Sequence, residues 1–113
     1  MISKALVAAS VKPIVLAMLM SGEHYGYQIL KRIQDVSGGR LDWSDAMLYP
    51  VLHRMEKDGL VSSQWKISDN NRMRKYYKIT ACGHEELNRE REQWLCVHNA
   101  MQHFHAAVPV HNR

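Results

Sequence analysis

Apolar residues recur at helical spacing in four parts of the chain and alternate with polar residues in one. The helical stripes are Ile14, Ala17 and Met18; Ile29, Leu30, Ile33 and Val36; Leu48, Val51, Leu52 and Met55; and Leu87 followed by Trp94, Val97, Met101, Phe104 and Val108. Residues three and four apart share one face of a helix, so each stripe predicts an amphipathic helix. The alternating part begins after Gly59 and predicts a β-hairpin between the third and fourth helices.

The ends of the first two helices follow from their flanking residues. The segment Ser3–Lys12 favours a helix but has little pattern, so it is either a separate helix or the front of the next one. Pro13 fits an early helical turn, and Ser21-Gly22 ends that helix. The second helix follows His24-Tyr25-Gly26 and stops at Ser37-Gly38-Gly39.

The third helix has clear start and stop signals. Ser44 or Asp45 is suited to the N-cap, and Gly59 stands where a left-handed residue ends a helix. Leu60 is then placed to pack back on Met55. Pro50 lies past the first turn, so we expect either a loosened first turn or a start nearer Met47.

The face of the third helix opposite its apolar stripe differs from a core-facing surface. It carries Ala46, Tyr49, Pro50, His53 and Lys57. These residues supply a hydroxyl, an imidazole and a cation beside small or rigid side chains. Such a face is suited to contact with a polar partner.

The predicted hairpin has a half-buried face and a basic flank. Val61, Trp65 and Ile67 alternate with polar residues, residues 68–73 form a turn, and Tyr77 and Ile79 lie on one side of the returning strand. The cations are Lys66, Arg72, Arg74, Lys75 and Lys78, against one acid, Asp69. They indicate either contact with phosphates or a solvated ribbon whose edges are protected by lysine.

The last helix is predicted to pair with a second helix. Thr80 caps it, and Glu85 and Glu86 lie near its positive end. From Trp94 to Val108 the apolar steps are 3-4-3-4, the spacing of a helix that packs along another helix. Pro109 ends it, and residues 111–113 are expected to fray. The predicted dimer interface comprises Leu87, Trp94, Val97, Met101 and Phe104.

Composition narrows the class of protein. The chain has 113 residues, a formal net charge of +4 and two cysteines. The length suits one small domain plus an added helix, and the charge alone is a weak sign of nucleic-acid binding. Two cysteines without a Cys-x-x-Cys motif fit a reducing cytoplasm, and no apolar run is long enough to cross a membrane.

The order of elements predicts a mostly α fold with a small β-hairpin wing: a winged helix-turn-helix domain over residues 1–80 and a dimerisation helix with its tail over residues 81–113. An α-helix fits the major groove of DNA, and a basic hairpin beside it meets phosphates or the minor groove. The candidate DNA-binding residues are Ser44, Ala46, Tyr49, Pro50, His53, Lys66, Asn70, Arg72, Arg74 and Lys75.

Three ordered motifs resemble the PadR family of bacterial transcriptional regulators: Tyr25-Gly26-Tyr27-Gln28-Ile29-Leu30, the run from Met47 to Leu60, and Arg74 to Thr80 with Gly83. The likeness runs from about Pro13 to Met101, and the short C-terminal part is similar to the compact subfamily with one long helix after the wing. The resemblance implies a homodimeric repressor that binds an inverted-repeat operator and is released by a small molecule. Ala46-Met47 depart from the Gly or Thr that often precedes Leu-Tyr in this family, which affects the expected operator contacts.

Trp94 has two interpretations. In the multidrug-responsive members that this chain resembles, a Trp at this distance from a Thr-x-x-Gly start faces its mate across the dimer, and planar, often cationic compounds stack there. The resemblance therefore implies a planar aromatic or phenolic effector for this chain. Thr80, Gly83 and Trp94 match that spacing, and His98 one turn later adds a polar group. Alternatively, Trp94 simply packs the dimer seam and His98 is an exposed helix residue.

Other chemistry is poorly supported by the sequence. His98, His103, His105 and His111, with Cys96, do not share the spacing of helical metal ligands, so we expect no metal and no cofactor. Cys82 and Cys96 are expected to be structural thiols. Because the chain has neither a nucleophile elbow nor a phosphate-binding glycine loop, we predict no enzyme activity.

Two functions remain open at this point. The first is a ligand-responsive repressor of a double-stranded DNA operator, which acts as a homodimer in the cytoplasm. The alternative is a winged-helix module that uses the same helix to bind a protein, because a fold does not determine its function.

Overall fold

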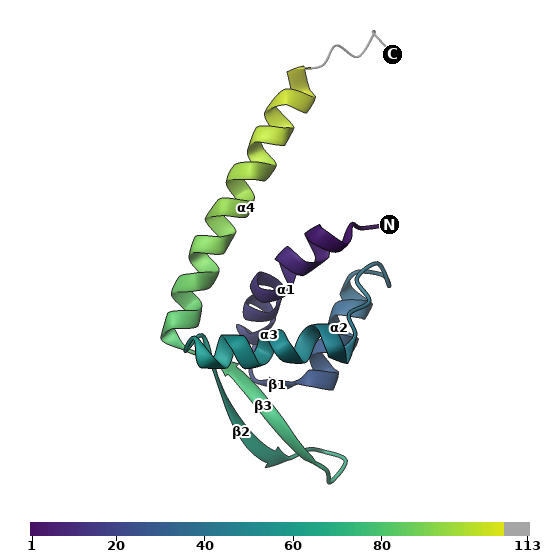
Figure 1. The fold of residues 1–113 in the computed structure, drawn as a ribbon, viewed down its shortest axis with the longest axis vertical. Coiled ribbons are helices and arrows are strands. Elements are labelled where there is room, and N and C mark those ends of the chain that lie inside the picture. Colours follow the sequence, from purple (N-terminus) through teal and green to yellow (C-terminus); the bar gives the residue numbers. More distant parts are fainter. Residues whose placement is uncertain (108–113) are drawn as a thin grey trace.

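The computed structural model describes residues 1–107. Its elements in chain order are α1 (Lys4–Leu19), β1 (His24–Tyr25), α2 (Gly26–Val36), α3 (Asp45–Lys57), β2 (Val61–Ile67), β3 (Met73–Ile79) and α4 (Ala81–Ala107) (Figure 1). This order confirms the predicted winged helix with an added C-terminal helix. The predictions for Val108, Pro109 and the tail lie outside the described residues.

The first helix is a single element. Ser3 is its N-cap, because the Ser3 hydroxyl accepts a hydrogen bond from the amide of Leu6 at 3.2 Å. Residues 3–12 are therefore the cap and front of the same helix, and Pro13 lies in its middle and not in an early turn. A proline removes the bond to the carbonyl four residues earlier. That carbonyl belongs to Ala9, an exposed residue, so water can hydrate it.

The third helix starts and ends at its expected caps. Ser44 accepts a hydrogen bond from the amide of Met47 at 3.2 Å, so the helix begins at Asp45 and the predicted later start is wrong. Gly59 has a φ of 77°, and the amide of Leu60 donates to the Met55 carbonyl at 2.9 Å. These are the features of a Schellman closure.

The sheet has three antiparallel strands in the order β1-β3-β2. In the hairpin, pairing runs from Val61 opposite Ile79 to Ile67 opposite Met73. The sequence pattern does not reveal β1, because its two residues are too few to show an alternation. The ring of Tyr25 in β1 meets Tyr76 of β3 edge to face, with centroids 5.2 Å apart.

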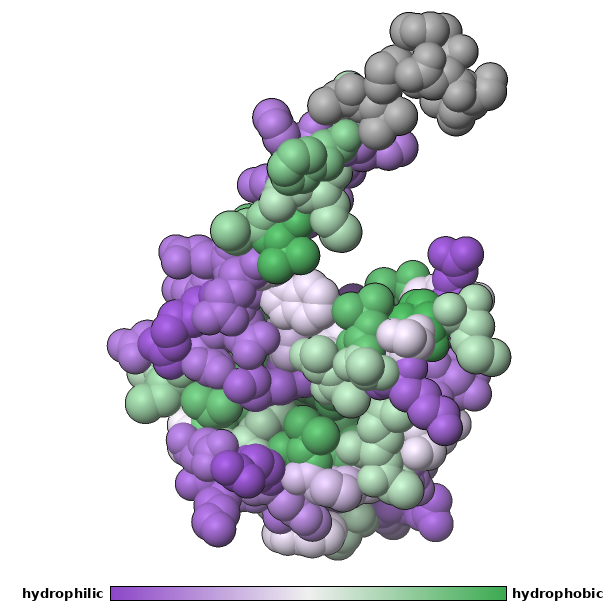
Figure 2. Space-filling model, turned by 45° about the horizontal axis from the view of Figure 1, so that its top comes forward, coloured by the Kyte–Doolittle hydropathy of each residue, from purple (hydrophilic) through white to green (hydrophobic). Residues whose placement is uncertain are grey.

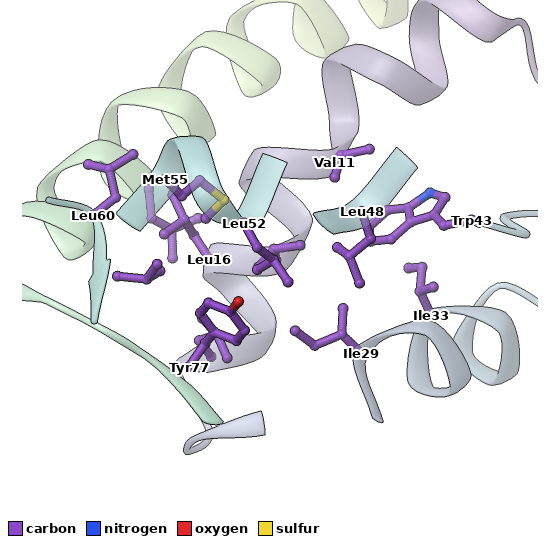
Figure 3. Packing of buried hydrophobic residues seen from close by; sticks show 14 residues of the cluster. Val11, Leu16, Ile29, Ile33, Trp43, Leu48, Leu52, Met55, Leu60 and Tyr77 are labelled. Carbon is purple, nitrogen blue, oxygen red and sulfur yellow. The ribbon is translucent and has the colours of Figure 1, made fainter. Parts of the chain in front are cut away.

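The core forms where α1, α2 and α3 meet the base of the sheet (Figure 3). Its fully buried side chains come from all of these elements: Val11, Val15, Leu16, Leu19, Ile29, Leu48, Leu52, Met55 and Tyr77. Trp43, predicted only as part of an extended connection, is also buried. Val36, predicted in the buried stripe of α2, is 72% exposed because α2 ends there beyond the core.

The start of α4 is joined to the end of α3. The Thr80 hydroxyl donates to the Gly59 carbonyl at 2.6 Å and accepts from the amide of Gly83 at 3.0 Å. The Thr80 amide donates to the Leu60 carbonyl at 3.1 Å. One threonine thus caps α4, as predicted, and fastens it to the C-cap of α3.

The C-terminal part of α4 leaves the body of the molecule. Figure 1 shows α4 projecting past the N-terminus of α1, and Figure 2 shows hydrophobic residues exposed along the projecting part. Leu87 is 4% exposed and belongs to the core of its own chain, which corrects its assignment to a dimer interface. Over residues 1–107, no helix has the length and apolar character needed to cross a membrane.

Lys12 of α1 holds the lower part of α4 through two carboxylates. Its ammonium lies 2.6 Å from Glu86 and 3.4 Å from Glu90. The hydrogen bond to Lys12, and then that to Arg89, lower the pKa of Glu86 below its ordinary value, while the bond to Glu86 raises the pKa of Lys12.

Replacing Lys12 with Met is expected to lower the free energy of unfolding by about 1 kcal/mol at neutral pH, as for a partly exposed ion pair. A carboxylate with a lowered folded-state pKa stabilises the fold above its unfolded pKa, and this is lost as pH falls through the folded value. The difference between wild type and variant should therefore narrow below the ordinary glutamate pKa of 4.5. Urea denaturation at a series of pH values, with Lys31→Met as a charge-matched control, measures this. If the unfolding free energies of wild type and Lys12→Met differ by the same amount in acid and at neutral pH, Lys12 does not form an ion pair with Glu86.

Candidate nucleic-acid interface

The outward face of α3 is open to solvent over most of its length. Ala46, Pro50, His53 and Lys57 are exposed, as is the N-cap Ser44. Their backbone is held by the caps at both ends of α3, while Leu48, Leu52 and Met55 anchor the opposite face in the core. The helix therefore presents a fixed row of polar and small side chains.

Tyr49 differs from its neighbours on that face. It is half-buried and packs against the core, with its hydroxyl end directly beside Gly26 at the start of α2. Burial, and then the charge of Asp45, raise the pKa of the Tyr49 phenol. The sequence predicted Tyr49 on the free polar face, but in the structure its side chain is half-buried against the core.

The tip of the wing carries exposed polar residues. Asn70 and Arg72 are exposed, and Arg72 forms no ion pair with any residue in the described range 1–107. The turn is closed by the Ser68 amide, which donates to the Arg72 carbonyl at 2.8 Å, and Asn71 adopts a φ of 63°. The expected tolerance of this asparagine cluster for positive φ is confirmed at Asn71.

Two cations of the wing are paired with acids from other elements. Lys66 contacts Glu23 and lies 4.8 Å from the centre of the Tyr76 ring, and Lys75 lies 3.5 Å from Glu56 of α3. The sequence of the hairpin shows only Asp69 as an acid near these cations, because Glu23 and Glu56 lie far from them in the chain and come close only in the fold. The unpaired positive charge of the wing is therefore smaller than its composition suggests.

Glu56 links α3 to the base of the wing. It accepts a hydrogen bond from the Ser63 hydroxyl at 2.5 Å. That bond, together with the charge of Lys75, lowers the pKa of Glu56. The Glu56 carboxylate thus connects α3 to both strands of the hairpin, a contact that no local sequence pattern indicates.

A groove of about 390 Å³, called here the wing groove, lies between α3 and the hairpin. Its lining residues come from five elements, β1, α2, α3, β2 and β3: Tyr25, Gly26, Tyr49, His53, Trp65, Met73, Arg74, Lys75 and Tyr77. The Arg74 guanidinium lies 4.9 Å from the centre of the Tyr25 ring. Four of the predicted DNA-binding residues therefore meet at one surface, whereas Ser44, Ala46, Pro50, Lys66, Asn70 and Arg72 lie outside this groove.

Trp94 lies between two shallow hollows at the junction of α1 and α4. One, of about 330 Å³, is lined by Ser10, Pro13, Ile14, Ala17, Leu87, Arg91 and Trp94. The other, also about 330 Å³, is lined by Ala9, Glu90, Gln93, Trp94 and Val97. His98 is exposed and lines neither hollow, so within one chain it does not add the expected polar group to the cavity beside Trp94.

The remaining candidate chemistry has no cluster to support it. Among residues 1–107, no three His, Cys, Asp or Glu side chains are grouped as metal ligands would be. Cys82 and Cys96 are both free and exposed. The surfaces that could act are thus the α3 face with the wing groove, and the apolar side of α4.

Comparison with known proteins agrees with this geometry. A model of the transcriptional regulator PadR-like family matches residues 15–89. A transcriptional regulator from Clostridium thermocellum superposes with a TM-score of 0.83 at 28% identity, covering 92% of this chain and 98% of that one. A PadR-like transcriptional regulator from Bacillus cereus gives a TM-score of 0.79 at 27% identity, covering 89% and 96%.

Among curated proteins, the transcriptional regulator Rv3488 of Mycobacterium tuberculosis is 42% identical over 48 residues, which are 42% of this chain and 44% of that protein. An uncharacterized protein of Lysinibacillus sphaericus is 25% identical over 104 residues, covering 92% of this chain and 95% of that protein. The family match takes in α2, α3, the wing and the joint to α4. The chain therefore belongs to the PadR-like family of transcriptional regulators.

Proposed function

We propose that the protein is a homodimeric repressor that binds an inverted-repeat operator and is released from it by a small-molecule effector. The observation that carries this proposal is the arrangement of α3 and the wing. An exposed polar helix face stands beside a hairpin, and the cations Arg74 and Lys75 lie in the groove between them. PadR-like regulators bind DNA, and this surface has the shape and charge for it.

In the proposed complex α3 enters the major groove. Ala46, Pro50 and His53 then face base edges, where hydrogen-bond donors and acceptors differ between base pairs. The wing lies over the adjacent minor groove, where Asn70 and Arg72 meet phosphates or sugar edges. Base contacts give sequence preference, while phosphate contacts give affinity and register.

Dimerisation is proposed through the projecting part of α4. Val97 is 57% exposed, Met101 62% and Phe104 71%, and Leu95 nearby is 50% exposed. A stripe of exposed large apolar residues is costly in water and is typical of an interface. A two-fold pairing of α4 would bury this stripe against its own copy, and would match two α3 helices to two half-sites.

The effector is proposed to bind beside Trp94. This indole is 37% exposed and borders both apolar hollows between α1 and α4. A planar aromatic compound would stack on the indole, and the second copy would close the open side. Lys12 also joins these two helices, so a ligand wedged between them would change the angle of α4 to the DNA-binding body.

Two substitutions separate the roles of helix and wing. His53→Ala should weaken binding to the operator more than binding to random duplex, because in the proposed complex the exposed His53 reaches base edges from the border of the wing groove. Arg72→Ala should weaken both to the same extent and reduce the salt slope by about one. Binding to the chain's own upstream region and to random duplex, measured by fluorescence anisotropy, checks both.

Lys4→Ala is the matched control, because it removes one positive charge from the exposed start of α1, away from α3 and the wing. It should change neither affinity. Equal losses for His53→Ala on both duplexes would remove α3 from sequence reading. No binding of the wild type to either duplex would refute the proposed function itself.

A further inference from the structure

Three large apolar side chains are exposed on one face of the outer wing. Trp65 is 61% exposed, Ile67 65% and Met73 58%. The pairing of Ile67 with Met73, and of Trp65 with Lys75, places all three on the sheet face that carries Val61 and Tyr77 in the core. The predicted buried face is therefore buried only at the base of the hairpin, because the helices do not extend to its tip (Figure 1).

This apolar strip continues into the wing groove. Trp65 and Met73 form the wing side of the groove, and Tyr49 and His53 form its α3 side. Arg74 and Lys75 supply the positive charge along the wing. The groove is thus lined by both apolar and cationic residues.

The geometry of duplex DNA decides what passes through such a groove. Each strand's sugar–phosphate backbone separates a major groove from the neighbouring minor groove. If α3 lies in the major groove and the wing lies over the neighbouring minor groove, the sugar–phosphate backbone that separates the two grooves must run between α3 and the hairpin. The inference below therefore rests on the proposed function.

We infer that the wing groove holds one sugar–phosphate strand, with Trp65 and Met73 packed on the deoxyribose rings and Arg74 on the phosphates. A backbone carries both apolar sugar carbons and anionic phosphates, and the groove is lined by both apolar and cationic residues. Of the two cations, Lys75 is paired with Glu56 and Arg74 is stacked on Tyr25. Part of the attraction between the wing and the DNA strand therefore comes from burial of apolar surface. This part does not change with salt concentration, because it releases no counterions.

Trp65→Ala is the test of this apolar contact. The variant should bind a random-sequence duplex of about 30 base pairs, three helical turns, roughly tenfold more weakly than the wild type at every salt concentration. The slope of log affinity against log salt should stay the same, because no charge is removed. Val36→Ala, which trims an exposed apolar residue at the far end of α2, is the control and should have no effect.

Tryptophan fluorescence gives a second readout that does not depend on affinity. Addition of the same duplex should change the emission of the wild type, and Trp65→Phe should lose most of that change while still binding. If the wild type binds but Trp65→Ala matches it, or Trp65→Phe keeps the full change, the backbone does not occupy the groove. A wild type that binds no duplex would instead remove the proposed function, and capture of a protein through Trp65 would then favour a protein-binding wing.

Discussion

Met101→Glu is expected to convert the protein from a dimer into a monomer. Met101 is 62% exposed in the single chain and lies in the middle of the apolar stripe on α4. In the proposed dimer it would be enclosed by its partner, where an unpaired carboxylate is strongly destabilising. Sedimentation velocity should then give the mass of one chain in place of two.

The same variant should also lose operator affinity. Two linked α3 helices bind two half-sites with an advantage of roughly 10²-fold or more over a single one, without any new contact. The control is Gln102→Glu, which adds the same charge one residue later, off the apolar stripe. A Met101→Glu protein that keeps the dimer mass would place the interface elsewhere and would contradict the proposed pairing of α4.

Gly83→Ala is expected to destabilise the fold by about 3 kcal/mol, the upper range for overpacking. A Cβ on Gly83 would overlap the backbone oxygen of Leu60 and lie 2.7 Å from Cγ1 of Ile79. A backbone carbonyl cannot move aside as a side chain does, and this one also accepts the hydrogen bond from the Thr80 amide. The whole joint between α3 and α4 would have to shift.

Urea denaturation followed by circular dichroism measures this effect. Cys82→Ala is the matched control, because it changes the exposed neighbouring residue and should alter the unfolding free energy by less than about 0.5 kcal/mol. If Gly83→Ala were as stable as wild type, the close contact between α4 and the C-cap of α3 would be wrong.

The parts of the fold that sequence could predict are those controlled by local chemistry. Ser44, Gly59 and Leu60 define the ends of α3 through hydrogen bonds within a few residues, and all three behave as expected. The change of period after Gly59 likewise places the hairpin. Such signals do not depend on which distant residues meet.

The errors arise where tertiary contacts decide the outcome. Alternation shows that Trp65 and Ile67 share a face with Val61, but only the packed helices decide how far along the strand that face is covered. Leu87 has the spacing of the dimer stripe, yet it lies close enough to the body to enter the core.

The candidate site shows the same division. Helical periodicity correctly predicts which residues of α3 face outward, with the exception of Tyr49. Gly26 has no side chain, which leaves room for the Tyr49 ring to turn toward the core. The ion pairs of Lys66 with Glu23 and of Lys75 with Glu56 join residues far apart in the chain. No local pattern signals them, so the sequence overstated the free positive charge of the wing.

In the proposed function two copies of this chain bind DNA together, each through its α3 and its wing. The most direct test is the affinity of the wild-type protein for its own upstream region, measured across a salt series beside a scrambled duplex of the same composition. A dimer that contacts several phosphates should lose roughly 10³-fold or more in affinity between about 50 and 200 mM salt, and should prefer the upstream region at each concentration. An affinity that does not change with salt, or that is equal for the two duplexes throughout, would contradict it.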